Sequence, residues 1–118
     1  MENIKIENLF IVGYGLAGGF GGIRDYEVIE ADNLEEAEKI AYELACEEYE
    51  RYVGLYGLRE IEQIMEEDEI EDYDEAELIY NEERESWLDY KAMSYNKDNE
   101  EKVKYHHYNN PYKSVTDI

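Results

Sequence analysis

Cysteine, proline and basic residues are scarce in this chain of 118 residues, which has one Cys, one Pro and 11 Lys and Arg against 32 Asp and Glu. The single cysteine, Cys46, excludes an intramolecular disulfide and is typical of a reducing cytosol. The chain also lacks a run of about 18 apolar residues and a basic, apolar leader segment. We therefore expect neither a membrane span nor export, and a cytoplasmic location.

The acidic residues are concentrated in one part of the chain, here called the acidic block (residues 27–89). It holds 25 acidic and four basic residues, whereas the flanks together carry seven of each, so the whole net charge of −21 lies in the block. Self-repulsion of this size opposes a compact state and disfavours binding to DNA or anionic lipid. A cationic partner suits such a surface, above all a protein surface that normally holds nucleic acid.

Two segments before the first helix are predicted to be strands. Residues 3–12 combine alternation with a short apolar run, and residues 23–31 alternate again. Six glycines lie between them in residues 13–22. A β-hairpin with a Gly-rich connection is the simplest arrangement of these segments.

Helical spacing dominates the acidic block. Asp32 or Asn33 can cap a helix that extends to Val53. Two further helices are predicted over residues 58–65 and 76–85. Residues 86–95 fit either the last helical turns or a third strand, and their aromatic side chains favour the strand.

This order predicts an α+β fold in which two or three acidic helices cover one face of a small antiparallel sheet. The sheet would consist of the N-terminal β-hairpin and a possible C-terminal strand. A single acidic domain is expected over residues 1–95. Residues 96–118 are polar and show no periodicity, which indicates a flexible tail.

The segment Gly13–Gly18 matches G-x-G-x-x-G, the dinucleotide-binding fingerprint. That motif requires a helix to begin inside it, because the pyrophosphate binds the amides of the helix N-terminus. Three more glycines follow within four residues, and each costs about 1 kcal/mol in a helix. We therefore predict a hairpin loop and no cofactor, with Tyr14 and Phe20 displayed for insertion into a partner's cleft as a functional alternative.

Signatures of metal binding and catalysis are weak throughout the sequence. The run Asp68–Glu77 lacks the glycine and the spacing of an EF-hand, and His106 and His107 have no third ligand nearby. Cys46 and Ser86 have no histidine partner in the predicted domain, and no carboxylate pair stands out among 32 acids. We predict no specific metal site and no enzymatic activity.

The density of carboxylates approaches that of nucleic acid. Residues 60–89 contain 15 acids, which in a helix rising about 1.5 Å per residue gives one charge per roughly 3 Å. Phosphates along one DNA strand are about 3.4 Å apart. The 13 tyrosines add rings with hydroxyl groups, a residue type enriched at interfaces. The alternative is that the acidic faces are solvated and serve only solubility.

In size, charge and the acid-and-tyrosine segments EEYERY (47–52) and EEDEIEDYDEAE (66–77), the chain resembles a class of bacteriophage proteins. These are small, acidic, Tyr-rich proteins that neutralise host restriction or CRISPR nucleases, several of them as DNA mimics. The resemblance is one of character across residues 27–95, and the Gly-rich segment is not part of it. It implies a non-enzymatic anti-restriction or anti-CRISPR inhibitor in the bacterial cytoplasm, bound to the basic nucleic-acid-binding surface of a host protein.

On this interpretation, the partner-binding residues are exposed carboxylates of the acidic block and two aromatic residues of the Gly-rich segment: Glu43, Glu47, Glu50, Glu66, Glu67, Asp68, Glu69, Glu71, Asp72, Asp74, Glu75, Tyr14 and Phe20. The alternative is a protein-interaction module whose charge serves solubility. Its contact site would be the Gly-rich hairpin or the face around Trp87.

Overall fold

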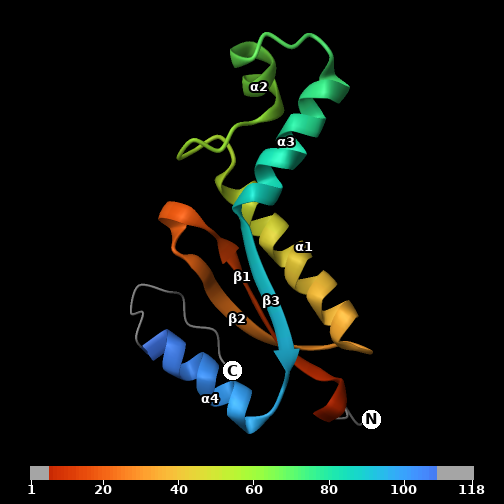
Figure 1. Cartoon of the computed structure of the whole chain (residues 1–118), viewed down its shortest axis with the longest axis vertical. Coiled ribbons are helices and arrows are strands. Elements are labelled where there is room, and N and C mark those ends of the chain that lie inside the picture. The colour runs from red at the N-terminus through yellow and green to blue at the C-terminus, as the bar shows by residue number, and fades with distance from the viewer. Residues whose placement is uncertain (1–5, 109–118) are drawn as a thin grey trace.

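The computed structural model describes the backbone of residues 6–108 and the side chains of residues 7–103. Three strands form one antiparallel sheet in the order β2-β1-β3, which confirms the predicted α+β class. Figure 1 shows the course of the chain through its elements: β1 (Leu9–Leu16), β2 (Gly22–Glu30), α1 (Leu34–Tyr52), α2 (Ile61–Glu67), α3 (Tyr73–Trp87), β3 (Leu88–Ser94) and α4 (Lys97–Tyr108).

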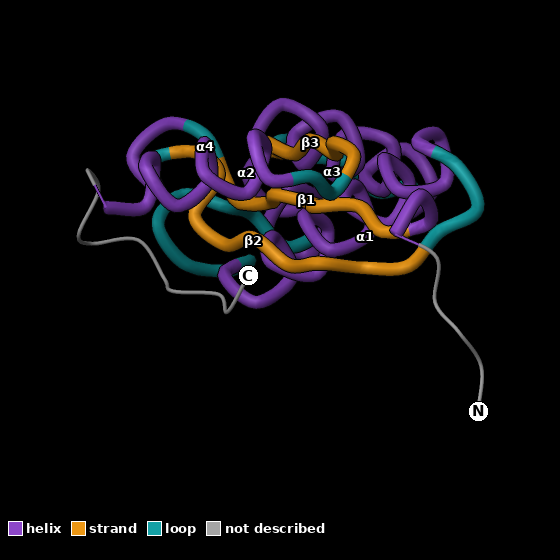
Figure 2. The backbone as a smooth tube through the Cα atoms, turned by 90° about the horizontal axis from the view of Figure 1, so that it is seen from below, coloured by secondary structure: helices purple, strands orange, loops and turns teal. Residues whose placement is uncertain are grey.

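The central strand β1 places alternate side chains on opposite faces of the sheet. Phe10 and Val12 pack against Ala37 and Ala41 of α1, whereas Ile11 belongs to a second core on the other face. In both Figure 1 and Figure 2 the strands lie between α1 and α4. Of the two or three acidic helices expected to cover one face, α1 does so, and α4 covers the other face, which was expected to lack a helix.

Helix α4 occupies part of the segment that was expected to be a polar tail. The Asn96 side chain accepts a hydrogen bond from the Asn99 amide (2.8 Å), and Val103 is buried against the sheet. One valine in a polar helix produces no visible periodicity, which is why the sequence did not indicate it. Residues 109–118 of the expected tail lie outside the described residues.

The predicted hairpin is confirmed, but its first strand begins and ends later than expected, and its second strand begins and ends one residue earlier. Strand β1 runs through Gly13 and Gly15, and the turn contains a single 3-10 turn, Gly18–Phe20. A Cβ on Gly13 would lie 2.7 Å from Cε1 of Tyr26, so this glycine permits a ring to lie directly on the strand. The chain leaves the turn into β2, and the helix that a dinucleotide site requires does not begin here.

The long helix α1 confirms the prediction for residues 33–53. The Asn33 side chain accepts the Glu36 amide hydrogen (2.8 Å) as N-cap. Helices α2 and α3 form an antiparallel pair that extends beyond the end of the sheet, so the molecule measures 53 × 32 × 21 Å. Helix α3 continues directly into β3, which confirms the third strand except for residues 86, 87 and 95. None of the described helices has the length and apolar character needed to cross a membrane.

Candidate functional site: an acidic surface and an aromatic cleft

All eleven carboxylates predicted from the sequence are on exposed residues. Glu43, Glu47 and Glu50 lie on α1 at spacings that place them on one helix face. The opposite face of α1 is buried through Ala37, Ala41, Ala45 and Tyr49. This row therefore follows the outer side of the helix that covers the sheet.

The other eight carboxylates lie in residues 66–75, here called the acidic tip, which joins α2 to α3. Figure 1 shows this connection at the end of the molecule farthest from α4. Asp72 caps α3 by accepting the Asp74 amide hydrogen (3.0 Å), and Asp74 and Glu75 lie in the first helical turn. Negative charge at a helix N-terminus is favourable, so part of the tip's charge stabilises its own helix.

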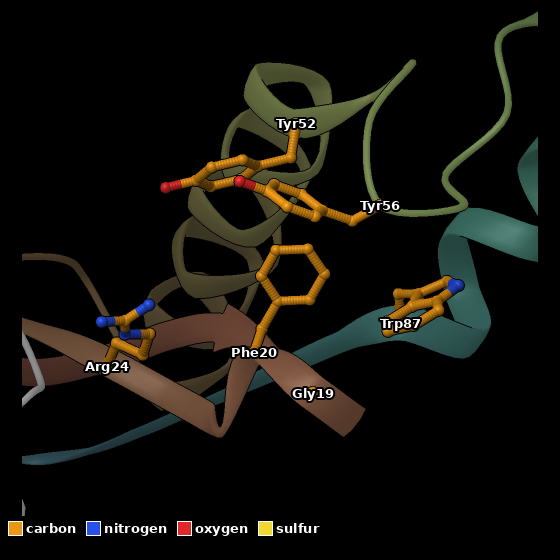
Figure 3. Close-up of a pocket in the computed structure, with 6 residues that line it drawn as sticks. All are labelled: Gly19, Phe20, Arg24, Tyr52, Tyr56 and Trp87. Atoms are coloured by element: carbon orange, nitrogen blue, oxygen red, sulfur yellow. The ribbon is translucent and has the colours of Figure 1, made fainter.

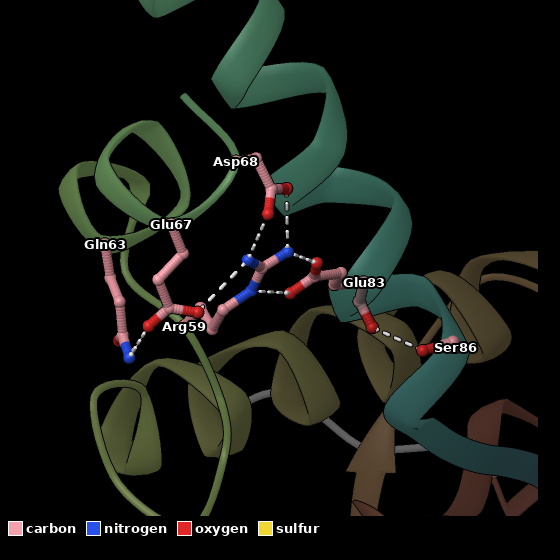
Figure 4. Close-up of polar contacts among 6 residues, drawn as sticks. All are labelled: Arg59, Gln63, Glu67, Asp68, Glu83 and Ser86. Carbon is pink, nitrogen blue, oxygen red and sulfur yellow. Dashed lines mark hydrogen bonds and ion pairs between the residues drawn. The ribbon is translucent and has the colours of Figure 1, made fainter. Parts of the chain in front are cut away.

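A single arginine ties the acidic tip to α3. The Arg59 guanidinium donates to both Asp68 oxygens (3.0 and 3.2 Å), to Glu67 (3.4 Å) and, through Nε, to Glu83 (3.2 Å), with a second ion-pair contact to Glu83 (Figure 4). We call these four residues the Arg59 clasp. The hydrogen bonds from Arg59 lower the pKa of the Asp68 carboxyl, and those to Glu83 and Asp68 raise the pKa of Arg59.

The clasp changes the interpretation of two predicted site residues. Glu67 and Asp68 were expected to face a partner, and both also contact Arg59 of the same chain while their side chains stay 50% and 38% exposed. Sequence reasoning missed Arg59 and Glu83 because the two residues are 24 positions apart. The available signal was the scarcity of basic residues, since Arg59 is one of only four in the acidic block.

Four aromatic side chains gather beside the hairpin turn around a cleft of about 400 Å³. Phe20 comes from the turn, Tyr52 from the end of α1, Tyr56 from the following loop and Trp87 from the end of α3 (Figure 3). The Phe20 ring centroid lies 5.4 Å from that of Tyr52 and 5.8 Å from those of Tyr56 and Trp87. Gly19 and Arg24 complete the lining of this aromatic cleft.

Tyr14 and Phe20, which were predicted to form one contact site, lie in different places, and only Phe20 lines the cleft. Tyr14 lies in β1 on the α1 face of the sheet, half-buried, rather than in a loop. Burial, followed by the charges of Glu27 and Asp25, raises its pKa to about 12. Phe20 instead meets Trp87, so the two locations considered for an aromatic contact site are one place. Tyr52 and Tyr56 were considered only among the tyrosines as a group and not as members of the site, and the glycines near Tyr56 were the available signal.

Tyr56 has unusual backbone geometry for its residue type. Its φ is 53°, and its side chain is 75% exposed. A bulky residue in the left-handed region is uncommon and marks a strained position. The loop therefore holds an aromatic ring in solvent at the edge of the cleft.

The described residues contain no group of three or more His, Cys, Asp or Glu side chains placed to hold a metal ion. His106 and His107, considered above as possible ligands, lie outside the described side chains. Burial raises the pKa of the Cys46 thiol, which favours its protonated, unreactive form. In comparisons with known proteins, no family model, no curated protein and no solved structure matches the chain.

Proposed function

We propose that this protein is a non-enzymatic inhibitor, encoded by a phage or mobile element, that mimics nucleic acid in the cytoplasm of the bacterial host. It binds the basic, nucleic-acid-binding surface of a host defence or DNA-processing protein. The observation that carries this proposal is the exposed carboxylate surface on α1 and the acidic tip. With 25 acids in a molecule 53 Å long, the mean spacing is about 2 Å per charge, between the values for one DNA strand and a duplex.

The mechanism is competition for the same cations. Carboxylates of α1 and the acidic tip form ion pairs with Lys and Arg side chains that otherwise hold phosphates. Because the surface is strongly anionic, it also attracts such a partner at long range and speeds their association. A partner occupied in this way cannot bind its nucleic acid.

Salt dependence tests the proposal. The immobilised protein is used to isolate a partner from host lysate, and the purified pair is then titrated between about 50 mM and about 200 mM salt. We expect the affinity to fall at least about a hundredfold over this range, and the protein to displace a labelled DNA duplex from the partner. An affinity that does not change with salt would exclude the mimicry mechanism.

A charge-neutralised variant locates the contact on the acidic tip. The test variant combines three substitutions at residues that neither cap α3 nor contact Arg59: Glu66→Gln, Glu69→Gln and Glu71→Gln. The matched control removes the same charge from exposed acids elsewhere: Glu7→Gln, Glu30→Gln and Glu101→Gln. We expect about tenfold weaker binding for the first variant and at most about twofold for the control.

A second candidate function is favoured by the aromatic cleft. In that case the protein is an interaction module that binds through the hairpin turn and its neighbouring rings, with the charge serving solubility. Replacing residues 17–21 by a short turn would remove Phe20 and abolish this function. The same replacement would leave binding by charge mimicry largely intact, so the two candidates predict different results.

A further inference from the structure

The aromatic cleft is lined by residues from three separate parts of the chain. Its shape therefore depends on the tertiary fold and not on the conformation of one loop. Its volume of about 400 Å³ lies toward the small end of ligand sites, which span about 300–1,000 Å³. Buried Leu16, Tyr49 and Leu58 form the core beneath it. The aromatic residues of the cleft therefore pack on a buried core. The volume of the cleft is sufficient for one planar group or one side chain.

The rings are arranged as a corner and not as a stack. Phe20 meets both Tyr56 and Trp87 at 86°, and Figure 3 shows Phe20 between them. The rings of these three residues line the cleft, and the face of an aromatic ring carries the negative part of its quadrupole. A cation over an aromatic face is attracted by it, most strongly over tryptophan.

The net charge of the molecule indicates which class of ligand the cleft can bind. A molecule with a net charge of −21 repels anions, so a nucleotide or a phosphate is disfavoured at this cleft. Arg24 is the basic residue of the lining, and Figure 3 shows it on the opposite side of Phe20 from Trp87. The corner at Trp87 and Tyr56 is therefore the part of the cleft suited to a positively charged group.

Among protein cations, the guanidinium group fits this corner best. It is planar, more weakly hydrated than an ammonium group, and stacks on aromatic faces. The strained backbone of Tyr56 supports a binding role, because residues in such conformations are held in place by the surrounding structure and cluster at functional sites. The ring of Tyr56 is also the most exposed of the large apolar side chains in the described residues.

We infer that the aromatic cleft binds an arginine side chain of the basic partner protein, against the rings of Tyr56 and Trp87. The inference rests on the proposed function, which supplies a partner rich in basic residues. It gives the cleft a role distinct from that of the acidic surface, because the carboxylates attract cations of any kind whereas the cleft selects arginine over lysine.

Trp87 provides a direct measurement because it is the only tryptophan in the chain. The full protein is titrated with acetyl-Arg-Arg-Arg-amide and, separately, with acetyl-Lys-Lys-Lys-amide of equal charge. We expect the arginine peptide to change the Trp87 fluorescence and the indole N–H resonance saturably. The lysine peptide should shift resonances of the acidic tip but change the Trp87 signals much less.

The substitution Tyr56→Asn removes the ring and keeps a residue type that tolerates a positive φ. We expect it to weaken the Trp87-detected affinity for the arginine peptide by about fivefold. Leu78→Gln, at an α3 side chain that is 65% exposed, is the control and should leave that affinity unchanged. Circular dichroism verifies that both variants are folded.

The possible results separate this inference from the proposed function. Unchanged Trp87 signals at saturating arginine peptide, or an equal response to both peptides, would overturn the inference while the salt test of the acidic surface still stands. An unaltered affinity in Tyr56→Asn would also overturn it. Conversely, a Trp87 response to arginine together with salt-independent partner binding would support the cleft and contradict nucleic-acid mimicry.

Discussion

At the scale of single residues, the glycines of the N-terminal segment have a packing role that composition alone does not reveal. Six glycines in ten residues were interpreted as a flexible connection, yet Gly13 and Gly15 lie within β1. The ring of Tyr26 covers Gly13, and Tyr26 is buried there. A flexible connection and a close approach of a ring to the backbone both require glycine, so the sequence could not show which of the two roles these glycines have.

This difference predicts that two Gly→Ala substitutions destabilise the protein to different extents. In Gly13→Ala the new Cβ would lie 2.7 Å from Tyr26 and 2.9 Å from Ile23, so we expect a loss of about 1–3 kcal/mol in the free energy of unfolding. At Gly19 an added Cβ meets nothing within 4 Å, and Gly19→Ala should change stability by less than about 0.5 kcal/mol. Urea unfolding measures both variants. Equal destabilisation would show that the close approach at Gly13 is unimportant.

At the scale of elements, prediction succeeded where a local signal repeats and failed where contacts are distant in sequence. Helix α1 has an N-cap and a stripe of apolar residues at three- and four-residue steps, and both are visible in the sequence. Among the described side chains of helix α4 only Val103 is buried, and the Arg59 clasp joins Glu67 of α2 to Glu83 of α3, which share no sequence pattern. The acidic residues of the candidate site were predicted by their density, whereas the aromatic cleft combines three segments that only the tertiary fold brings together.

The Arg59 clasp predicts a pH dependence for the docking of α2 on α3. Arg59 holds the pKa of Asp68 below its ordinary value of 3.8, so the clasp contributes stability above that pH. The contribution is lost as the pH falls through the lower, folded-state pKa. Arg59→Met should therefore reduce the urea midpoint of the native protein at neutral pH, and the difference between the two proteins should shrink below about pH 4.

A double-mutant cycle of Arg59→Met and Asp68→Asn separates this pair from other effects of acid. The two substitutions should be less than additive at neutral pH, because either one removes the same interaction. Additive effects, or a difference from the native protein that persists at low pH, would show that the clasp does not stabilise the helix pair. Lys39→Met, which replaces an exposed base on α1, is the control for removing one positive charge.

At the scale of the whole molecule, the fold and the proposed function respond to charge in opposite ways. Carboxylates on one elongated body repel each other, and this repulsion destabilises the compact state. The same field attracts a cationic partner. Four basic residues in the acidic block offset little of it, and Arg51, Arg59 and Arg84 are each paired with an acid of the chain.

Added salt should therefore stabilise the protein while it weakens binding. Raising ionic strength from about 0.01 M to about 1 M shortens the screening length from about 30 Å to about 3 Å, so repulsion across the 53 Å molecule is largely removed. We expect the urea midpoint to rise over this range. Measured beside the affinity, this result shows that salt releases the partner by screening and not by unfolding the inhibitor. A midpoint that falls with salt would mean that the ion pairs within the chain outweigh its self-repulsion.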